Sequence, residues 1–288
     1  MKNKSPLVSV GIPTYNRPEG LRRTLECITR QTYKNLEIII SDNCSPGPET
    51  EVVAREFMVK DSRIQYFRQE KNMGGAFNLK FVLKKATGEY FMWAADDDYF
   101  DTYELVSKLV SKAREGNYVL VFPNVNIICN NRIGKNVMTE VFKDCKTDYE
   151  YLMAWCSYGA GYPVYGLYNF EQMSLAQLSF SFDDYLRCFN EGTFLHKIFL
   201  HGRARFVEDV SFNFSRNSDN MSSKVLPSIL LIDFLRYTKR VLLLYVSSQL
   251  SLTNKIKIVT IILKKHSRYV LALLGSTARY CWRYLIKG

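Results

Sequence analysis

The chain has 288 residues, of which 47% are hydrophobic and 23% charged, and its formal net charge is +11. This composition predicts a globular protein with one large domain or one domain and an extension, and it excludes a disordered or fibrous chain. The seven cysteines form no C-x-x-C pair, which argues against a disulfide framework or a zinc knuckle and favours a reducing compartment. The first apolar run, residues 7–12, is too short for a signal peptide, so we expect a cytoplasmic protein.

The first hundred residues alternate short apolar runs with amphipathic stretches, which is typical of βαβ units and a largely parallel sheet. Helices are expected to begin at Pro18 and after Pro48 and to cover residues 76–86, and strands are expected at residues 7–12, 36–40, 64–67 and 90–94, with another within 116–129. In an open sheet of this type, ligands bind beyond the carboxyl ends of the strands. Candidate functional residues should therefore lie at 14–17, 42–45 and 96–98.

Three consecutive aspartates, Asp96, Asp97 and Asp98, follow the strand expected at residues 90–94. Carboxylates this close repel one another unless a cation lies among them, and Mg²⁺ or Mn²⁺ held by one or two carboxylates would also bind a diphosphate. Taken alone, such a triplet is more often a solvated turn or a helix N-terminus. The sequence has neither G-x-G-x-x-G after the first strand nor G-x-x-x-x-G-K-[ST], so a dehydrogenase or P-loop enzyme would lack its phosphate cradle.

Four stretches occur in a telling order and spacing: V-S-V-G-I-P-T-Y-N-R at residues 8–17, Q-T-Y-K-N-L-E-I-I-I-S-D-N-C-S at 31–45, N-M-G-G-A-F-N at 72–78 and A-T-G-E-Y-F-M-W-A-A-D-D-D at 86–98. Together they resemble the nucleotide-binding half of family 2 glycosyltransferases, which have a GT-A fold. The resemblance is strong over residues 1–100 and scattered to residue 223. It implies a Rossmann-like α/β fold with a mostly parallel central sheet flanked by helices. It also implies an inverting, metal-dependent hexosyltransferase-type enzyme.

The same resemblance implies roles for the residues after the strands. Pro13, Thr14 and Tyr15 would line the base pocket, Asp42 would contact the edge of the base, and Asp96 would contact the ribose. These residues would bind a nucleoside diphosphate sugar.

The metal ion implied by the resemblance is Mg²⁺ or Mn²⁺. Asp97 falls where the family's metal-binding aspartate falls, and Asp98 is the neighbouring carboxylate that would assist it. Many members read D-x-D-D here, and this chain has Ala95 at the first of those positions. Metal binding by this D-x-D-like motif would therefore depend on Asp97 and its neighbours.

The second half of the chain should supply the catalytic base and the acceptor site. Asp183 and Asp184 resemble the family's acidic pair, which implies Asp184 as the base that takes the proton of the acceptor hydroxyl, with Asp183 as the reserve candidate. The pair could instead begin a helix, with Asp183 as its cap. Arg216 could face the diphosphate, since a guanidinium matches phosphate geometry, or it could form a surface ion pair.

All of the excess positive charge lies in the last 65 residues, where residues 224–288 contain 12 Lys and Arg and a single acidic residue, Asp233. Apolar runs interrupted by these charges are typical of amphipathic helices that bind the surface of an anionic membrane. A helical cap with a solvated basic face fits the pattern equally well. Residues 1–223 are neutral and carry no basic stripe, so nucleic acid is not an expected partner.

These observations predict a GT-A domain at residues 1–223, divided into a nucleotide-sugar-binding half at 1–100 and an acceptor-binding half at 101–223, with a basic helical extension at 224–288. The expected function is transfer of a sugar to a glycan or a lipid-linked glycan in polysaccharide synthesis, at the inner face of the cell membrane. The alternatives are a sugar nucleotidyltransferase, which would need a glycine-rich loop after the first strand, and a non-catalytic membrane-binding module.

Overall fold

The computed structural model describes residues 5–100, 102–129, 132–158, 161–178, 190–215 and 227–287. The chain forms two compact units. The first comprises residues 1–144, 162–179 and 201–216, and the second comprises residues 145–161, 180–200 and 217–288.

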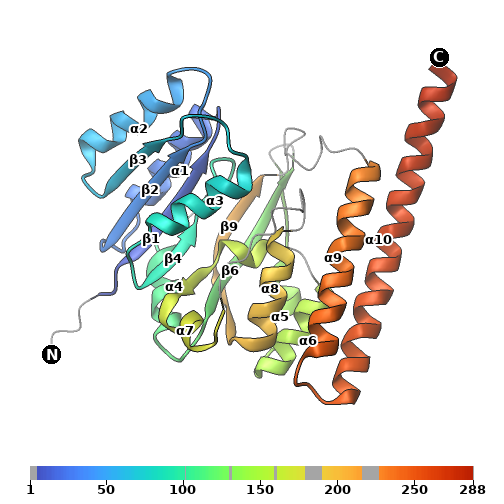
Figure 1. The fold of residues 1–288 in the computed structure, drawn as a ribbon. Coiled ribbons are helices and arrows are strands. Elements are labelled where there is room, and N and C mark those ends of the chain that lie inside the picture. The colour runs from blue at the N-terminus through green and yellow to red at the C-terminus, as the bar shows by residue number, and fades with distance from the viewer. Residues whose placement is uncertain are drawn as a thin grey trace. The chain divides into compact units, whose positions relative to one another are not determined.

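The first unit begins with the predicted β-α-β-α-β-α-β order, drawn from blue to cyan in Figure 1. Its elements are β1 (Val8–Thr14), α1 (Pro18–Thr29), β2 (Leu36–Asp42), α2 (Glu49–Lys60), β3 (Ile64–Arg68), α3 (Gly75–Lys85) and β4 (Tyr90–Trp93). Pro18 occupies the first turn of α1, where its missing N–H costs nothing, and Leu21, Leu25 and Ile28 are buried at helical spacing. The prediction of a Rossmann-like beginning is confirmed.

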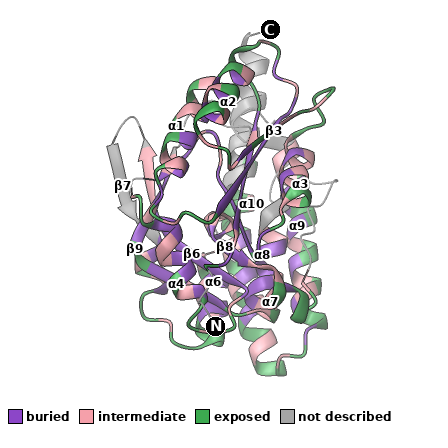
Figure 2. Cartoon of the chain, turned by 90° about the vertical axis from the view of Figure 1, so that its left-hand side faces the viewer, coloured by how far each residue is buried: buried purple, intermediate pink, exposed green. Residues whose placement is uncertain are grey.

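The strands of this half run parallel in the order β3-β2-β1-β4. Every residue of β2 and β4 is buried, as expected for strands covered on both faces. Figure 2 shows α1 and α2 on one side of these purple strands and α3 on the other. Gly11 of β1 lets α3 approach closely, because a β-carbon there would lie 2.7 Å from the Val82 side chain.

The other half of the sheet is mixed, and the complete sheet has nine strands in the described residues. β4 pairs antiparallel with β8 (Leu167–Asn169), β8 pairs antiparallel with β6 (Leu120–Cys129), and β6 pairs parallel with β9 (Ala204–Ser215). The remaining elements of the unit are β5 (Tyr99–Phe100), α4 (Leu105–Ala113), β6 (Leu120–Cys129), β7 (Arg132–Asn136), α5 (Val137–Phe142), the 3₁₀ helix η1 (Tyr162–Tyr165), β8 (Leu167–Asn169), α7 (Phe170–Leu175) and β9 (Ala204–Ser215). The fold is thus α/β, with a mixed central sheet flanked by helices.

The second unit is helical. It contains α6 (Asp148–Tyr158), most of α8 (Asn190–His201), α9 (Pro227–Ser247) and α10 (Leu252–Lys287). The two long helices α9 and α10 lie side by side, in orange and red in Figure 1. The core of the unit includes Trp155 of α6, His196 of α8 and Tyr245 of α9, all buried.

Candidate active site

Hydrogen bonding between the strands brings the predicted post-strand residues to one edge of the sheet. In the parallel ladder Thr14 at the end of β1 is paired with Asp42 at the end of β2. On the other side of β1, the Ala94 N–H donates to the Gly11 carbonyl at 2.9 Å, so the loop that follows β4 begins beside the end of β1. The carboxyl ends of three parallel strands therefore place Thr14, Asp42 and Asp96 together, as the open-sheet rule predicts.

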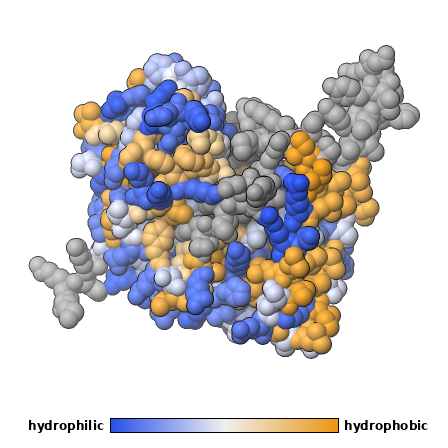
Figure 3. All heavy atoms as spheres, viewed as in Figure 1, coloured by the Kyte–Doolittle hydropathy of each residue, from blue (hydrophilic) through white to orange (hydrophobic). Residues whose placement is uncertain are grey.

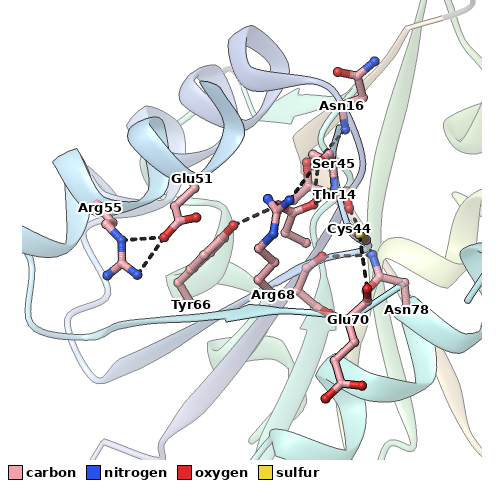
Figure 4. A network of polar contacts seen from close by, with 12 residues as sticks. Thr14, Asn16, Cys44, Ser45, Glu51, Arg55, Tyr66, Arg68, Glu70 and Asn78 are labelled. Atoms are coloured by element: carbon pink, nitrogen blue, oxygen red, sulfur yellow. Dashed lines mark hydrogen bonds and ion pairs between the residues drawn. The ribbon is translucent and has the colours of Figure 1, made fainter. Parts of the chain in front are cut away.

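Asp42 is completely buried, and both of its carboxylate oxygens accept hydrogen bonds. Oδ1 accepts from the Ser45 backbone N–H at 2.9 Å and from the Ser45 hydroxyl at 2.6 Å. Oδ2 accepts from the Tyr66 hydroxyl at 2.8 Å and from the Arg68 guanidinium at 3.3 Å. Figure 4 shows Tyr66, Arg68 and Ser45 converging beside Thr14. These donors offset the cost of burying a charge.

Arg68 is the accessible member of this group, because its side chain is 36% exposed whereas that of Asp42 is fully enclosed. Arg68 also donates to the Ser45 carbonyl at 2.8 Å, which fixes its guanidinium over the turn after β2. Burial, followed by the hydrogen bond to Asp42, raises the pKa of Tyr66, so its phenol remains a neutral donor at physiological pH. A ligand at this corner would meet Arg68 before it met Asp42.

The aspartate triplet is held against α1. Thr24 of α1 donates to the carbonyls of Ala95 at 3.0 Å and Asp98 at 3.2 Å. Gly20 of α1 is needed for this close approach, because a β-carbon there would lie 1.9 Å from the Asp96 carbonyl oxygen. The loop that carries the triplet is therefore held to α1 through its own backbone carbonyls.

The side chains of the triplet differ in their surroundings. Asp96 is buried and accepts from the Thr14 hydroxyl at 2.8 Å, whereas the Asp97 side chain is 27% exposed. Arg17, just after β1, lies 3.1 Å from an Asp96 oxygen and 2.7 Å from an Asp97 oxygen. Burial raises the pKa of Asp96 to about 6, although Arg17 favours its charged form. Asp98 is buried, with only 1% of the residue exposed.

The carboxylates at this edge provide the hard oxygen ligands that Mg²⁺ and Mn²⁺ prefer. Within the described ranges, however, no three His, Cys, Asp or Glu side chains gather around one point. Asp97 is the accessible carboxylate, and its negative charge is offset by Arg17 in this structure. The residues thus fit a metal held by one protein carboxylate and completed by the phosphates of a bound nucleotide. Asp97 as a ligand and Asp98 as its assistant remain predictions.

The turn before α3 borders the same edge. Asn43 donates to Asn72 at 2.9 Å and accepts from the Met73 N–H at 2.9 Å. Gly74, the residue just before α3, adopts a positive φ of 86°, which favours glycine. Asn78 in the first turns of α3 donates to the carbonyls of Thr14 at 3.2 Å and Ser41 at 2.9 Å. The N-M-G-G-A-F-N stretch therefore ties α3 to the ends of β1 and β2.

The predicted site residues fall into two groups. Thr14, Asp42 and Asp96 are brought together, and Pro13 and the exposed Tyr15 flank Thr14 at the end of β1. Asp183, Asp184 and Arg216 lie outside the described residues. Their proposed roles stay predictions.

The sequence placed Arg17 in the candidate range 14–17 without a specific role, and it indicated no role for Tyr66 or Arg68. Arg17 stands directly after the first strand in the P-T-Y-N-R stretch, and that position was a usable signal. Tyr66 and Arg68 are two residues apart on β3, so they point to the same face of that strand. Nothing in the local sequence shows that this face meets Asp42.

The fold agrees with comparisons to known proteins. The model of glycosyl transferase family 2 matches residues 9–170, more than half of the chain. The chain therefore belongs to glycosyl transferase family 2.

Two curated relatives illustrate the match. Over 131 residues the chain is 37% identical to the GalNAc(5)-diNAcBac-PP-undecaprenol beta-1,3-glucosyltransferase of Campylobacter jejuni, a stretch that covers 45% of this chain and 41% of that protein. Over 133 residues it is 30% identical to the putative colanic acid biosynthesis glycosyl transferase WcaA of Escherichia coli, covering 46% and 47% of the two chains. The matches thus span less than half the length of these relatives.

Solved structures share the fold. Residues 1–349 of S. aureus TarS, in complex with UDP-GlcNAc, align with a TM-score of 0.74 at 18% identity, covering 90% of this chain and 72% of that one. The mannosyltransferase PcManGT of Pyrobaculum calidifontis, in complex with GDP-Man and Mn²⁺, aligns with a TM-score of 0.59 at 15% identity, covering 97% and 81%. The predicted GT-A fold is confirmed.

Proposed function

We propose that the chain transfers a sugar from a nucleoside diphosphate sugar to a hydroxyl of a glycan or lipid-linked glycan, with inversion at the anomeric carbon. The observation that carries the proposal is the cluster at the end of β1, where Thr14, Asp96, Asp97 and Arg17 are hydrogen-bonded beside the buried Asp42. Family membership supports it, and so do the structural neighbours in complex with UDP-GlcNAc and with GDP-Man.

In this proposal the chain's own residues position the nucleotide. Thr14 and Tyr15 line the base pocket with Pro13, and Arg68 fixes the corner beside Asp42. Asp96, held by Thr14, faces the ribose. A compact polar edge with several fixed side chains suits a ligand that carries a base, a ribose and a diphosphate.

Asp97, assisted by Asp98, would hold a Mg²⁺ or Mn²⁺ ion. When bound, this ion offsets the charge that develops on the leaving diphosphate. Arg17 pairs with Oδ2 of Asp97, so an ion bound at that oxygen would displace the guanidinium. Asp184 accepts the proton of the attacking hydroxyl, with Asp183 as the reserve, and Arg216 faces the diphosphate.

The acceptor belongs to the proposal as well. A lipid-linked acceptor is supported by the relative from Campylobacter jejuni, whose name specifies an undecaprenol-linked acceptor, and by the basic residues at 224–288. It would place the chain at the inner face of the cell membrane. A sugar nucleotidyltransferase or a non-catalytic module gains no support from the comparisons.

The experiment is a measurement of nucleotide release from a panel of nucleoside diphosphate sugars by the full chain, with Mn²⁺ or Mg²⁺ and with a chelator. We expect metal-dependent release from at least one sugar nucleotide. Asp184→Asn should lower acceptor-dependent turnover by about 10²- to 10⁴-fold, because an amide keeps the shape of the side chain but cannot take the proton. Nucleotide binding should be kept.

Asp183→Asn is the matched control. If Asp183→Asn loses turnover and Asp184→Asn keeps it, the two roles are exchanged. If both variants remain active, the base lies elsewhere in the chain. Release from none of the sugar nucleotides would contradict the proposed function.

A further inference from the structure

The two long helices of the second unit bury one face and expose another. On α9 the buried side chains include Phe234, Tyr237, Val241 and Tyr245, which recur at helical spacing. Tyr237 and Tyr245 contact His196 of α8, and the Lys265 ammonium of α10 donates to the Tyr158 carbonyl of α6. These contacts fix which faces of α9 and α10 point inward.

The opposite face of α9 forms an exposed stripe, since successive helical residues are rotated by about 100°. Each apolar residue of this stripe is at least half exposed to solvent, from 50% at Ile232 to 59% at Val246. The α9 stripe consists of Ile232, Leu235, Leu243 and Val246 together with the exposed basic residues Arg236, Lys239 and Arg240. It contains no acidic side chain.

α10 carries a second stripe of the same composition. The α10 stripe consists of the exposed residues Leu252, Ile256, Leu263, Leu271 and Leu274 together with the exposed basic residues Lys257, Lys264 and Arg268. Figure 3 shows hydrophobic residues in orange over α9 and α10, at the right of the view, with hydrophilic residues in blue between them. The one acidic residue at 224–288, Asp233, is buried, so its charge is not displayed on either stripe.

We propose that the α9 and α10 stripes are a docking surface for a bilayer that contains anionic phospholipid. Exposed leucines and isoleucines enter the region between headgroups and acyl chains, and the lysines and arginines beside them contact lipid phosphates. None of the helices in the described part of the chain combines the length and hydropathy needed to cross a membrane, so the contact is peripheral. The inference deepens the proposed function by supplying a surface for a lipid-linked acceptor.

The composition of the stripes favours a bilayer over other anionic partners. A nucleic acid would satisfy the basic residues and would leave the exposed leucines in water. A second copy of the chain would cover the leucines but would bring like charges together, because both stripes carry only positive charge. A bilayer surface with anionic headgroups accommodates both properties.

The test is co-sedimentation of the full chain with vesicles of phosphatidylcholine alone and of phosphatidylcholine mixed with phosphatidylglycerol, at low and high salt. We expect binding to the mixed vesicles, weak binding to the neutral ones, and partial release by salt, because salt screens charge but not apolar insertion. Lys239→Glu combined with Lys264→Glu should weaken binding by about 30-fold or more, since each basic residue near an anionic surface contributes about fivefold.

Matched controls lie on the first unit. Lys84→Glu with Lys143→Glu makes the same change in net charge at two exposed positions and should leave vesicle binding unchanged. For the apolar component, Ile256→Gln with Leu263→Gln should reduce the binding that survives high salt. Val52→Gln with Val59→Gln, at exposed positions of α2, should not. Circular dichroism of each variant checks that its helices are intact.

Several results would overturn the inference. These are equal binding of the test and control variants, equal binding to neutral and mixed vesicles, and no binding of the full chain to either. A preference for duplex RNA over mixed vesicles would also overturn it. So would a dimer in solution that does not bind vesicles and that dissociates in both the Lys239→Glu, Lys264→Glu variant and the Ile256→Gln, Leu263→Gln variant. Nucleotide binding is measured on the same variants without vesicles. The proposed function predicts that the stripe substitutions leave nucleotide binding unchanged, so a failure of the membrane inference can be told from a failure of the proposed function.

Discussion

The guanidinium of Arg17 lies between two carboxylates at the carboxyl end of the sheet, 3.1 Å from Asp96 and 2.7 Å from Asp97. It thereby offsets a pair of like charges that would otherwise repel. In the proposed function a divalent ion does the same for Asp97 when the nucleotide is bound. Arg17 and the ion therefore compete for one carboxylate.

This competition predicts that the stabilisation of the protein by a bound metal depends on Arg17. Arg17→Met should lower the free energy of unfolding without metal by about 1 kcal/mol, a value reduced for the partial exposure of the pair. Added Mn²⁺ should raise the melting temperature of Arg17→Met more than that of the wild type, because the variant has no guanidinium to displace. Differential scanning fluorimetry of both proteins, with Mn²⁺ and with chelator, measures the effect.

Arg22→Met is a suitable control, since Arg22 also lies on α1 but pairs with Glu56, away from the triplet. It should respond to Mn²⁺ as the wild type does. An equal Mn²⁺ response of Arg17→Met and wild type would contradict the idea that both cations use Asp97.

At the scale of single elements, the buried helical contacts of the second unit include a titratable group. His196 of α8 accepts a hydrogen bond at Nδ1 from the Trp155 indole N–H at 3.0 Å, because an indole can only donate. The neutral ring therefore carries its proton on Nε2, which lies 3.1 Å from the Tyr237 hydroxyl oxygen. The Tyr245 hydroxyl lies 2.7 Å from Nδ1 and 3.2 Å from the Cys156 sulfur.

Burial, together with the positive charge of Lys265, lowers the pKa of His196 from 6.5 to about 3. The unfolded chain therefore takes up a proton below pH 6.5 that the folded chain does not, so stability is full above pH 6.5 and falls as the pH drops toward 3. By pH 5 the loss from this group should be about 2 kcal/mol. Urea unfolding followed by tryptophan fluorescence at pH 7.5 and pH 5 measures it.

His196→Phe should be less stable at both pH values and should show a smaller difference between them. Some dependence will remain, because burial also lowers the pKa of His266 to about 4 and that group titrates in the same direction. If the variant keeps the full pH difference of the wild type, His196 is not the group responsible.

The elements of the first half could be predicted from the sequence because their signals are local. Apolar runs of strand length and prolines at helix starts predict the starts of all seven elements from β1 to β4 within one residue, and the ends of the four strands and of α3 within two. The parallel direction of these strands follows from their βαβ connections, which brings their carboxyl ends to the same edge. The pairing of β4 with β1, which brings Asp96 beside Thr14, is seen only in the structure.

The partners of these residues could not be predicted, because they depend on contacts between distant segments. Tyr66 and Arg68 meet Asp42 only through the pairing of β2 with β3. The mixed half of the sheet has a similar origin, since β6 pairs with β9 across roughly eighty residues of chain that carry no local signal of that pairing. Long-range pairing of this kind is not encoded in periodicity.

At the scale of the whole molecule, the chain divides into two compact units that do not follow the sequence in order. The change in charge at residue 224 predicts a boundary there. In the described residues, α9 and α10 form a unit with α6 and α8, to which they are tied by contacts such as that of Cys156 with Tyr245. The predicted boundaries of the domains stay predictions.

This arrangement is compatible with both interpretations of the basic extension. Helices α9 and α10 cover the buried faces of α6 and α8 with one side, which is what a cap does. Their other sides carry the apolar and basic stripes, which is what a membrane-binding element needs. Charge and apolar periodicity in the sequence predict both properties, but only the packing shows which residues belong to each.

In the proposed function, the edge formed by β1, β2 and β4 binds a nucleoside diphosphate with the help of a metal held by Asp97. Isothermal titration of the full chain with UDP and with GDP, in Mn²⁺ and in chelator, tests it most directly. We predict saturable binding of one of the nucleotides in Mn²⁺, weakened about tenfold or more both by chelator and by Asp97→Asn, since each leaves diphosphate charge uncompensated. Binding of neither nucleotide, or equal affinity with and without metal, would contradict the account.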